Sequence, residues 1–252
     1  MRIVVVGASG MMGSKIVRAL GRSGQSVVEA SSKTGIDAIT GVGLDTAFVG
    51  ADAVIDVTNS GSFGEGDALS FFKQAGKNLL SAAKRAGVPH YLALSVVGAE
   101  HMVENDYFRA KLVQENLIRA SGVPYTIVRS TQFFEFFAGI VNSSTAVEGS
   151  LRVANVRLQP ISADEAATIV AKHASGKPFN SIQEIGGPEP LDLIEIAREL
   201  LTATEDARLV GSDPDAAYFG VNVALESLLP AANTISGKQS FHDWLSGTVS
   251  AS

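Results

Sequence analysis

The sequence contains no cysteine, and this absence excludes several kinds of site. Without thiols there is no disulfide framework, no cysteine nucleophile and no thiolate metal site. The four histidines (His90, His101, His173 and His242) are scattered, with no His-x-x-x-His or His-Glu pair, so we expect no zinc site. The Gly-x-Ser-x-Gly sequence of serine hydrolases is also missing. We therefore expect neither a bound metal nor hydrolase chemistry of that kind.

Basic stretches and long apolar runs are missing as well. The 26 Asp and Glu outnumber the 20 Lys and Arg, and no run of basic residues is interleaved with aromatic ones. This balance argues against nucleic acid or an anionic membrane surface as the main partner. No apolar run reaches the ~18 residues that a membrane span needs, and the N-terminus lacks the features of a signal peptide. We expect a cytoplasmic globular protein.

The first twenty residues carry the most informative pattern. Residues 3–6 form an unbroken apolar run, which predicts a strand buried on both faces. Three glycines follow at a spacing of three (Gly7, Gly10 and Gly13), and apolar residues within 14–20 share one face of a predicted helix. Glycines let the backbone approach a pyrophosphate closely, and the N–H groups at a helix N-terminus favour its negative charge. The pattern predicts a dinucleotide site; a glycine turn without a ligand is the alternative.

The end of the second predicted strand, residues 26–31, bears on which dinucleotide binds. NAD-binding folds usually place an Asp or Glu there, about 20 residues beyond the glycine motif, to bind the adenosine ribose. Here the sequence reads Ser31-Ser32-Lys33, in which hydroxyls and an ammonium replace the carboxylate. Glu29 is the nearest acid and comes too early for this role, unless the strand ends two to four residues sooner than expected. These groups suit a 2′-phosphate, so we expect NADP(H) to be favoured over NAD(H). A polar surface turn is the alternative for each residue taken alone.

Alternating apolar runs and helical patterns continue to about residue 130 and predict a doubly wound parallel sheet with the cofactor across the carboxyl ends of its strands. Beyond residue 139 the alternation becomes irregular. We expect short strands at 151–153 and 182–185, helices at 164–174 and 191–203, and a final helix around Trp244. The prediction is thus a nucleotide-binding domain over residues 1–138 and a small α/β cap over residues 139–252 that contacts the substrate.

Polar residues follow two of the predicted strands. The loop Thr58-Asn59-Ser60-Gly61-Ser62 comes after the strand at 53–57, and we expect Thr58 and Asn59 to contact the cofactor because ligands bind at carboxyl ends of parallel strands. The strand at 90–98 delivers Ser95, which we expect to orient a substrate carbonyl.

Tyr107 and Lys111 lie four residues apart in the next predicted helix, so they share one face. A phenol ordinarily has a pKa near 10, and an ammonium one turn away, together with the positive nicotinamide of the cofactor, would lower that pKa and fit Tyr107 for proton transfer. Lys111 is also suited to bind the nicotinamide ribose, which needs no chemistry.

Phe133, Phe134 and Phe137 belong to the most aromatic stretch of the chain. Their spacing fits both a hydrophobic core and the wall of a substrate pocket. An apolar slot lined by them would suit a flat quinone.

Four segments, Val6–Gly13, Leu94–Gly98, Tyr107–Lys111 and Ser121–Arg129, resemble the atypical, NmrA-like NAD(P)-binding branch of the short-chain dehydrogenase/reductase superfamily. The resemblance extends over residues 1 to about 140 and implies a Rossmann-type fold with a small C-terminal substrate region. It also implies that Tyr107 and Lys111 match the superfamily's catalytic pair, although this branch often replaces the tyrosine. Where related sequences often carry an NADP-selecting arginine, this chain has Ser32 and Lys33. The pyrophosphate contacts fall by position on Gly7, Ser9, Gly10, Met11, Met12 and Gly13.

Members of this branch include quinone and dye reductases as well as catalytically silent redox sensors. We therefore expect an NADPH-dependent reductase of a quinone or a related aromatic or carbonyl acceptor. The alternative is a non-catalytic NADP(H) sensor that acts through a protein partner. In a third possibility, the protein reduces a quinone by aligning hydride donor and acceptor without an acid residue.

Overall fold

The computed structural model describes residues 1–60, 66–147 and 149–249. Its main sheet is parallel and has seven strands in the order β12-β9-β5-β4-β3-β1-β2. Strand β1 lies between β2 and β3, because after β2 the chain passes back over β1 and forms β3 on its other side. The predicted doubly wound α/β fold is confirmed. The strands of this sheet are β1 (Arg2–Val6), β2 (Ser26–Ala30), β3 (Ala53–Asp56), β4 (Tyr91–Val96), β5 (Tyr125–Ser130), β9 (Ser181–Gly186) and β12 (Ile235–Ser236).

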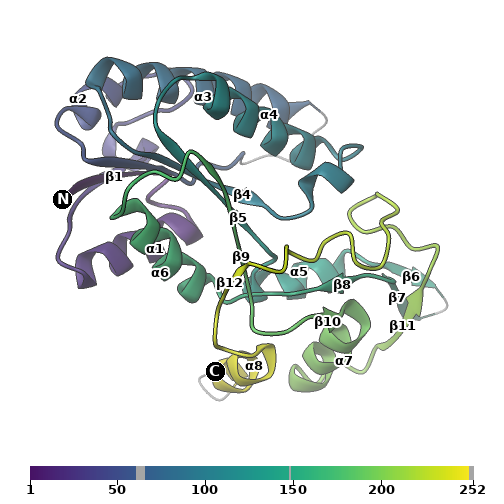
Figure 1. The fold of residues 1–252 in the computed structure, drawn as a ribbon. Coiled ribbons are helices and arrows are strands. Elements are labelled where there is room, and N and C mark those ends of the chain that lie inside the picture. The colour runs from purple at the N-terminus through teal and green to yellow at the C-terminus, as the bar shows by residue number, and fades with distance from the viewer. Residues whose placement is uncertain (61–65, 148, 250–252) are drawn as a thin grey trace. The chain divides into compact units, whose positions relative to one another are not determined.

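Helices cover both faces of this sheet (Figure 1). Three of them, α2 (Leu44–Phe48), α3 (Asp67–Ala86) and α4 (Asp106–Ala120), lie on one face, and α1 (Met11–Arg22) and α6 (Ala163–Ala174) lie on the other. With both faces covered, the central strands are apolar on both sides: all four residues of β3 are buried.

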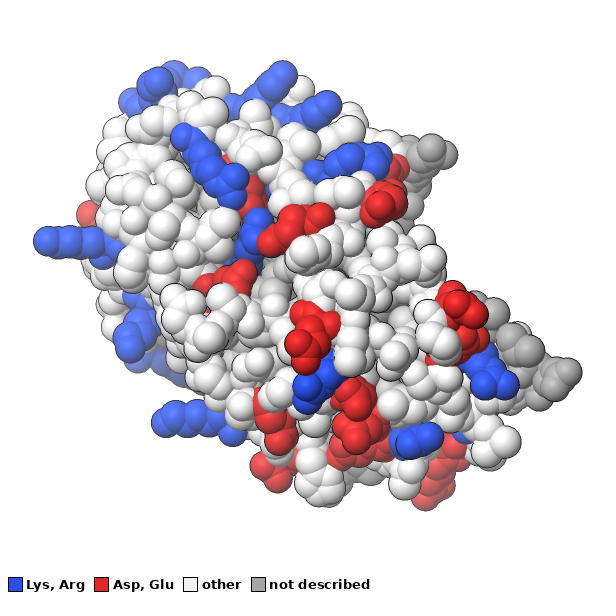
Figure 2. All heavy atoms as spheres, turned by 45° about the vertical axis from the view of Figure 1, so that its right-hand side comes forward, with Lys and Arg blue, Asp and Glu red and all other residues white. Residues whose placement is uncertain are grey.

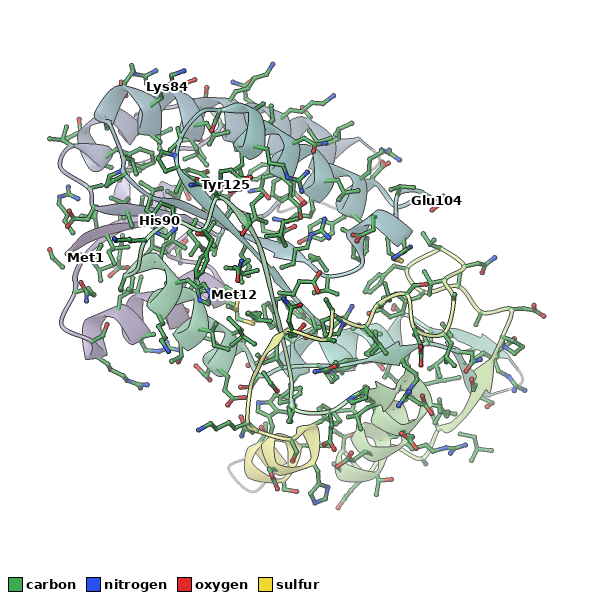
Figure 3. The ribbon with its side chains drawn as sticks, viewed as in Figure 1. Met1, Met12, Lys84, His90, Glu104 and Tyr125 are labelled. Atoms are coloured by element: carbon green, nitrogen blue, oxygen red, sulfur yellow. The ribbon has the colours of Figure 1, made fainter. Side chains whose placement is uncertain are left out.

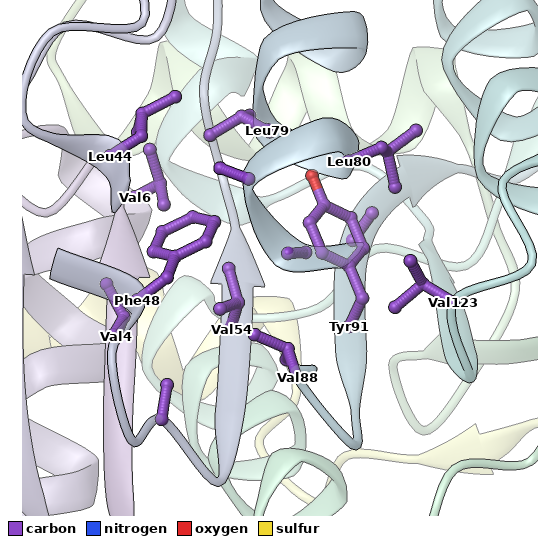
Figure 4. Packing of buried hydrophobic residues seen from close by; sticks show 14 of the residues in the cluster. Val4, Val6, Leu44, Phe48, Val54, Leu79, Leu80, Val88, Tyr91 and Val123 are labelled. Carbon is purple, nitrogen blue, oxygen red and sulfur yellow. The ribbon is translucent and has the colours of Figure 1, made fainter. Parts of the chain in front are cut away.

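The hydrophobic core between the sheet and α2 and α3 explains why the chain folds this way. Phe48 and Leu79 are fully buried against Val4 and Val54 of the central strands (Figure 4). Burying one such large side chain stabilises the fold by roughly 1.5–3 kcal/mol. The core also contains Tyr91, whose hydroxyl is the one oxygen drawn among these side chains and requires a polar partner.

The chain forms two compact units that interleave along the sequence. Unit 1 comprises residues 1–96, 106–129 and 167–183, and unit 2 comprises residues 97–105, 130–166 and 184–252. The predicted boundary after residue 138 divides the chain only once, whereas in the structure the chain passes several times between the units. The assignment of residues 139–252 to substrate binding stays a prediction.

Unit 2 contains a three-stranded sheet in the order β11-β7-β6 and a two-stranded ribbon of β8 and β10. Two features of this region differ from the sequence prediction. The helix expected from Leu191 begins at Leu193, because Leu191 and Asp192 pair with β8 and Asp192 then caps the helix. The segment at 209–213, for which no strand was expected, pairs in parallel with β7. The elements are β6 (Thr145–Val147), β7 (Ser150–Ala154), β8 (Arg157–Leu158), β10 (Leu191–Asp192), β11 (Leu209–Asp213), α5 (Phe137–Asn142), α7 (Leu193–Ala203) and α8 (Phe241–Val249), with short 3-10 turns at Ser32–Thr34, Ala99–His101 and Phe134–Phe136.

Candidate functional site

The glycine turn after β1 is packed so closely that two of its glycines cannot carry a side chain. A Cβ on Gly7, whose φ is +87°, would lie 2.8 Å from the carbonyl oxygen of Val57, next to the end of β3. A Cβ on Gly13 would lie 2.1 Å from the carbonyl oxygen of Gly7. Gly10 is less constrained, because a Cβ there would lie 3.3 Å from the same oxygen. Gly7 and Gly13 are therefore steric requirements of the turn and of the close packing of α1 against it.

The turn leaves the N-terminus of α1 open. No side chain caps this end among the described residues, and the first turn contains no acidic residue. The first amide groups of a helix have no partner within it, so those of Met11, Met12 and Gly13 are available to an anion. Ser9 and Gly10 are exposed, whereas Met12 (labelled in Figure 3) is buried. The uncapped N-terminus of α1, together with a glycine turn whose backbone a ligand can approach closely, is suited to bind a pyrophosphate.

The end of β2 is tied directly to this turn. The amides of Gly7 and Ala8 both donate to the carbonyl oxygen of Ala30, at 2.9 and 3.3 Å. Beyond Ala30, the buried Ser31 begins a short 3-10 turn in which its amide donates to Thr34 Oγ1 at 3.0 Å. The following two side chains, Ser32 and Lys33, are exposed. The structure thus places Ser31, Ser32 and Lys33 next to the glycine turn.

A buried carboxylate, Asp56, organises the end of β3. It is 1% exposed, and its Oδ1 accepts hydrogen bonds from the amide and the hydroxyl of Thr58 at 3.0 and 2.7 Å. Its Oδ2 accepts from the Tyr91 hydroxyl and from Gln114 Nε2, both at 2.8 Å. One carboxylate therefore links β3, β4, α4 and the first residues of the predicted cofactor loop.

The same loop contains a polar atom that protein groups do not satisfy. Ser60 is 6% exposed, and its Oγ has no hydrogen-bond partner within the described part of the chain. Buried hydroxyls are nearly always paired, so this orphan is consistent with a ligand contact. Asn59 beside it is exposed. Gly61 and Ser62, the other residues of the expected loop, lie outside the described residues.

Lys111 is buried in unit 1 and joined to this network. Its ammonium donates to the carbonyl oxygen of Leu94 at 2.7 Å and to Gln114 Oε1 at 2.5 Å, and it lies 4.6 Å from the centre of the Phe72 ring. Burial lowers the pKa of Lys111 to about 8, although the nearby Asp56 and Glu115 favour its charged form. Gln114 therefore bridges Lys111 to Asp56, and Asp56 connects in turn to Thr58.

Ser95 contacts a second buried carboxylate. Its hydroxyl donates to Glu115 Oε1 at 2.6 Å, and both residues are almost fully buried. Arg129 binds both oxygens of Glu115, at 2.8 and 2.9 Å, and Arg119 adds a contact at 2.9 Å. The proton of Ser95 is thus engaged inside unit 1, and a contact of Ser95 with a substrate stays a prediction.

Tyr107 behaves differently from the expectation. It packs beside Phe72 and Phe108, with ring centres 6.2 and 5.6 Å away. Burial raises the pKa of Tyr107 to about 12, which is the opposite of the expected lowering. The rings of Phe72 and Phe108 beside the phenol disfavour its ionised form, which the distance to Lys111 along the helix did not take into account. At neutral pH the side chain is a protonated phenol.

The three predicted pocket residues lie in unit 2. Phe134 and Phe137 are buried and pack on Phe241 of α8 at 5.4 and 5.6 Å between ring centres, and Phe134 also contacts Trp244. These are core contacts, one of the two alternatives that the sequence leaves open. Phe133 is 8% exposed and lies 5.7 Å from Phe136.

Sequence reasoning missed Asp56, Gln114 and Glu115. A signal for Asp56 was present, since a carboxylate inside the apolar run Ala53–Val57 is costly to bury without partners. Gln114 and Glu115 follow Lys111 by three and four residues, which places them on neighbouring positions of the same helix face. Their partners on other strands are not visible in the sequence.

Metal ligands do not gather anywhere in the described ranges: no three His, Asp or Glu side chains are placed to share an ion. Both ring nitrogens of His90 (labelled in Figure 3) are hydrogen-bonded within the fold, 2.9 Å from Thr126 Oγ1 and 3.1 Å from the carbonyl oxygen of Gly176, so this histidine has a structural role. Among the helices described, none combines the length and the apolar character that crossing a bilayer requires.

Comparison with known families agrees with this geometry. A family model described as NAD(P)H-binding matches residues 7–136, which include the glycine turn, Asp56 and Lys111. Divinyl chlorophyllide a 8-vinyl-reductase, a chloroplastic protein of Cucumis sativus, is 29% identical to this chain over 262 residues. The match covers 88% of this chain, and the chain spans about three fifths (60%) of that relative's length.

Two solved structures share the fold. A short-chain dehydrogenase/reductase superfamily protein from Agrobacterium tumefaciens with bound NAD has a TM-score of 0.73 at 17% identity, covering 100% of this chain and 97% of that one. The NADPH-dependent quinone oxidoreductase QOR2 of Escherichia coli, complexed with NADPH, has a TM-score of 0.62 at 19% identity, covering 84% and 77%. Both nicotinamide cofactors thus occur among proteins of this fold.

Proposed function

This chain belongs to the NAD(P)H-binding family, and from that premise we propose that it is an oxidoreductase that uses NADPH to reduce a quinone or a related aromatic or carbonyl acceptor. One observation carries the proposal: a glycine turn with no room for a Cβ at Gly7 or Gly13 leads into a helix whose N-terminus is capped by no side chain of the described residues. A backbone without side chains at these positions can approach a pyrophosphate closely, and the free amides of the helix N-terminus bind its negative charge. When bound, the nicotinamide supplies hydride to the acceptor.

Each predicted cofactor residue has a task in this proposal. Residues 7–13 hold the pyrophosphate through backbone amides. Ser31, Ser32 and Lys33, next to the turn, hold the adenosine ribose and its 2′-phosphate, since these three residues just after β2 present hydroxyls and an ammonium and include no carboxylate. Thr58 and Asn59 contact the nicotinamide half, and Lys111 hydrogen-bonds its ribose. The buried, charged network around Asp56 holds Lys111 and Thr58 in place for these contacts.

Tyr107 is the candidate proton donor. Because burial raises its pKa to about 12, the phenol keeps its proton at neutral pH and can deliver it to a substrate oxygen that gains negative charge. A reduction needs this protonated form, whereas an oxidation would need the phenolate.

The acceptor class is tested by following NADPH oxidation with a panel of quinones, dyes, aldehydes and ketones. We expect the quinones to give the highest kcat/KM. Tyr107→Phe should lower kcat roughly 10²–10⁴-fold, the usual contribution of a positioned acid, and leave NADPH binding unchanged. Full activity of this variant would indicate catalysis by alignment alone.

Cofactor choice is tested by titrating the protein with NADPH and NADH. Lys33→Ala should weaken NADPH binding about 10-fold, the size of one charge-assisted contact, and leave NADH binding unchanged. Lys84→Ala, at an exposed position near the end of α3 (labelled in Figure 3), is the matched control and should change neither. Equal or tighter binding of NADH by the parent would overturn the preference.

A second candidate function has an observation of its own. The hydroxyl of Ser95, which a catalytic role would direct to the substrate, already donates to Glu115 within unit 1. This favours a non-catalytic NADP(H) sensor that signals to a protein partner. It is distinguished by tight NADPH binding without oxidation by any member of the acceptor panel.

A further inference from the structure

The turn that follows β2 in unit 1 is held together by one side-chain hydroxyl. Thr34 is the last residue of this 3-10 turn, and its Oγ1 accepts a hydrogen bond from the amide of Ser31 at 3.0 Å. The same oxygen lies 2.9 Å from the carbonyl oxygen of Glu29 and 3.0 Å from that of Ser31, and a hydroxyl has a single proton to donate to these two acceptors. Thr34 therefore joins the turn to the last residues of the strand.

The amide of Ser31 depends on this hydroxyl. Ser31 lies one residue beyond the end of β2, where the pairing with β1 stops. The residue is only 8% exposed, and a buried amide that loses its acceptor is costly. Removal of the Thr34 hydroxyl therefore forces the backbone of the turn to move.

The backbone is anchored on both sides of the turn. Before it, the carbonyl oxygen of Ala30 accepts from the amide of Gly7, which fixes the end of β2 against the glycine turn. After it, Gly35 adopts a φ of +77°, and the amide of Ile36 donates to the carbonyl oxygen of Ser31 at 3.0 Å. Ile36 also packs against the hydrophobic core of unit 1. Between these anchors, Thr34 determines the path of the chain.

The two residues that lie between Ser31 and Thr34 carry the polar groups assigned to the cofactor. Ser32 and Lys33 are exposed, and no hydrogen bond or ion pair to another described residue engages the Lys33 ammonium. A long lysine side chain loses rotamer freedom when it binds a ligand, and this loss lowers affinity. A rigid backbone at its base limits the loss, so affinity for a phosphate at this turn depends on the turn itself as well as on the charge.

Resting on the cofactor choice proposed above, we propose that Thr34 is a positioning residue that sets the preference for NADPH over NADH. Its hydroxyl holds the backbone in the conformation in which Ser32 and Lys33 bind the 2′-phosphate. Thr34 acts through these two residues, because its own hydroxyl is occupied by the backbone. NADH has a hydroxyl in place of the 2′-phosphate, so the loss of this positioning affects NADPH selectively.

The test is Thr34→Val in the full chain, a substitution that removes the hydroxyl and keeps the shape. Because Thr34 is exposed, the core of unit 1 stays intact. The dissociation constant, measured by isothermal titration calorimetry, should rise about 10-fold for NADPH and less than about 2-fold for NADH. Adenosine 2′,5′-bisphosphate, which lacks the nicotinamide, should show the same rise as NADPH. Equal losses for NADPH and NADH would show a merely structural role and overturn the proposal.

Two further variants separate the hydroxyl from other effects of the substitution. Thr34→Ser keeps the hydroxyl and should bind both cofactors as the parent does. Thr40→Val is the matched control: the Thr40 hydroxyl also accepts from a backbone amide, that of Val42 at 3.4 Å, in the connection that follows the same turn. This control should change neither affinity. A Thr34→Ser variant that loses NADPH selectively would contradict the role of the hydroxyl.

A double-mutant cycle tests whether Thr34 acts through Lys33. If it does, Thr34→Val should weaken NADPH binding by less than about 2-fold when Lys33→Ala is already present, whereas independent effects would multiply. An unchanged ratio of NADPH to NADH affinity in Thr34→Val overturns the positioning role and leaves the proposed function standing. A parent whose NADPH preference depends on Thr34, but which oxidises NADPH with no acceptor, contradicts the reductase function and leaves the positioning role standing. A parent without a preference for NADPH overturns the cofactor choice and the positioning role together.

Discussion

At the scale of single residues, two glycines in one helix differ sharply in what a methyl group would meet. The Cβ of Gly13→Ala would lie 2.1 Å from the carbonyl oxygen of Gly7, so the turn or the helix must move. We expect a loss of about 2–3 kcal/mol in the free energy of unfolding, as for other overpacked sites, and a large loss of NADPH affinity. Chemical denaturation and cofactor titration measure the two effects.

Gly21→Ala, in the same helix, is the matched control. Nothing lies within 4 Å of its Cβ position, and alanine is favoured over glycine in helices by roughly 0.5–1 kcal/mol. This variant should be as stable as the parent or more so and should bind NADPH normally. Equal behaviour of the two variants would contradict the steric role of Gly13.

Lys111 gives a prediction about pH. Its pKa is about 8 in the folded protein against 10.5 ordinarily, because burial disfavours the ammonium. Between these values the unfolded chain binds more protons than the folded one, so the free energy of unfolding rises with pH across this window. The gain is about 3 kcal/mol, complete only above the ordinary pKa and absent below about pH 7.

Lys111→Met removes the titrating group and should lose this rise. The difference in free energy of unfolding between parent and variant should shift in favour of the parent as the pH increases from about 8 to 10.5. Lys84→Met, which removes an exposed lysine of α3, should follow the parent throughout. Parallel profiles for all three proteins would show that Lys111 is not desolvated as described.

For single residues, prediction from the sequence was right where one local rule determines the conformation. The glycine spacing predicted a turn that the structure shows to be sterically required. It failed for the pKa of Tyr107, because the distance to one lysine along a helix says nothing about the apolar rings that surround the phenol. The partners of Asp56 were also out of reach, since Tyr91 and Gln114 lie 35 and 58 residues away in sequence.

At the scale of elements, Asp56 connects two strands, one helix and one loop, so its replacement should have a large effect. In Asp56→Asn one oxygen becomes an NH2 group that faces donors from Thr58, Tyr91 or Gln114. Leaving buried donors unpaired costs roughly 1–3 kcal/mol each, so we expect a loss of about 3 kcal/mol. NADPH affinity should fall as well, because Thr58 and Lys111 lose their common support.

Asp52→Asn is the control for this experiment. Its carboxylate accepts a hydrogen bond from the amide of Arg2 at 2.7 Å, but Asp52 is exposed. We expect a loss of less than about 1 kcal/mol and normal NADPH binding, as for most surface substitutions. Similar losses in Asp56→Asn and Asp52→Asn would contradict the role of Asp56 as a connecting group.

Helices and strands with a clear hydrophobic pattern of their own were predictable from the sequence. Strands that form only by pairing with a segment far away in the sequence were not. The buried strands of the main sheet and α3 follow from uninterrupted apolar runs and an amphipathic pattern. By contrast, β10 has two residues and exists because β8 pairs with it, and β11 is a strand because β7 offers a free edge. In unit 2, tertiary contacts rather than local preference decide the structure.

At the scale of the whole molecule, charge is divided unevenly between the two units. Unit 1 contains fifteen Lys and Arg against nine Asp and Glu, whereas unit 2 contains five against seventeen, so formal charges of +6 and −12 make up the net charge of −6. Figure 2 marks the Lys and Arg side chains in blue and the Asp and Glu side chains in red. The overall acidity of the chain, which is all that composition reveals, thus conceals a basic cofactor-binding unit.

This division predicts how salt affects cofactor binding. A basic unit attracts an anionic dinucleotide at long range, and added salt screens the attraction, with a Debye length of about 10 Å at 0.1 M. NADPH carries a 2′-phosphate that NADH lacks, so its association rate constant should fall more steeply with salt, roughly 10-fold between low and physiological ionic strength. Stopped-flow measurements with both cofactors test this.

Lys33→Ala should make the salt dependence of the two association rate constants more alike, because it removes the cation assigned to the extra phosphate of NADPH. Lys84→Ala should preserve the difference between the two cofactors. Identical salt dependence of NADPH and NADH in the parent would show that the 2′-phosphate does not bind the basic end of β2.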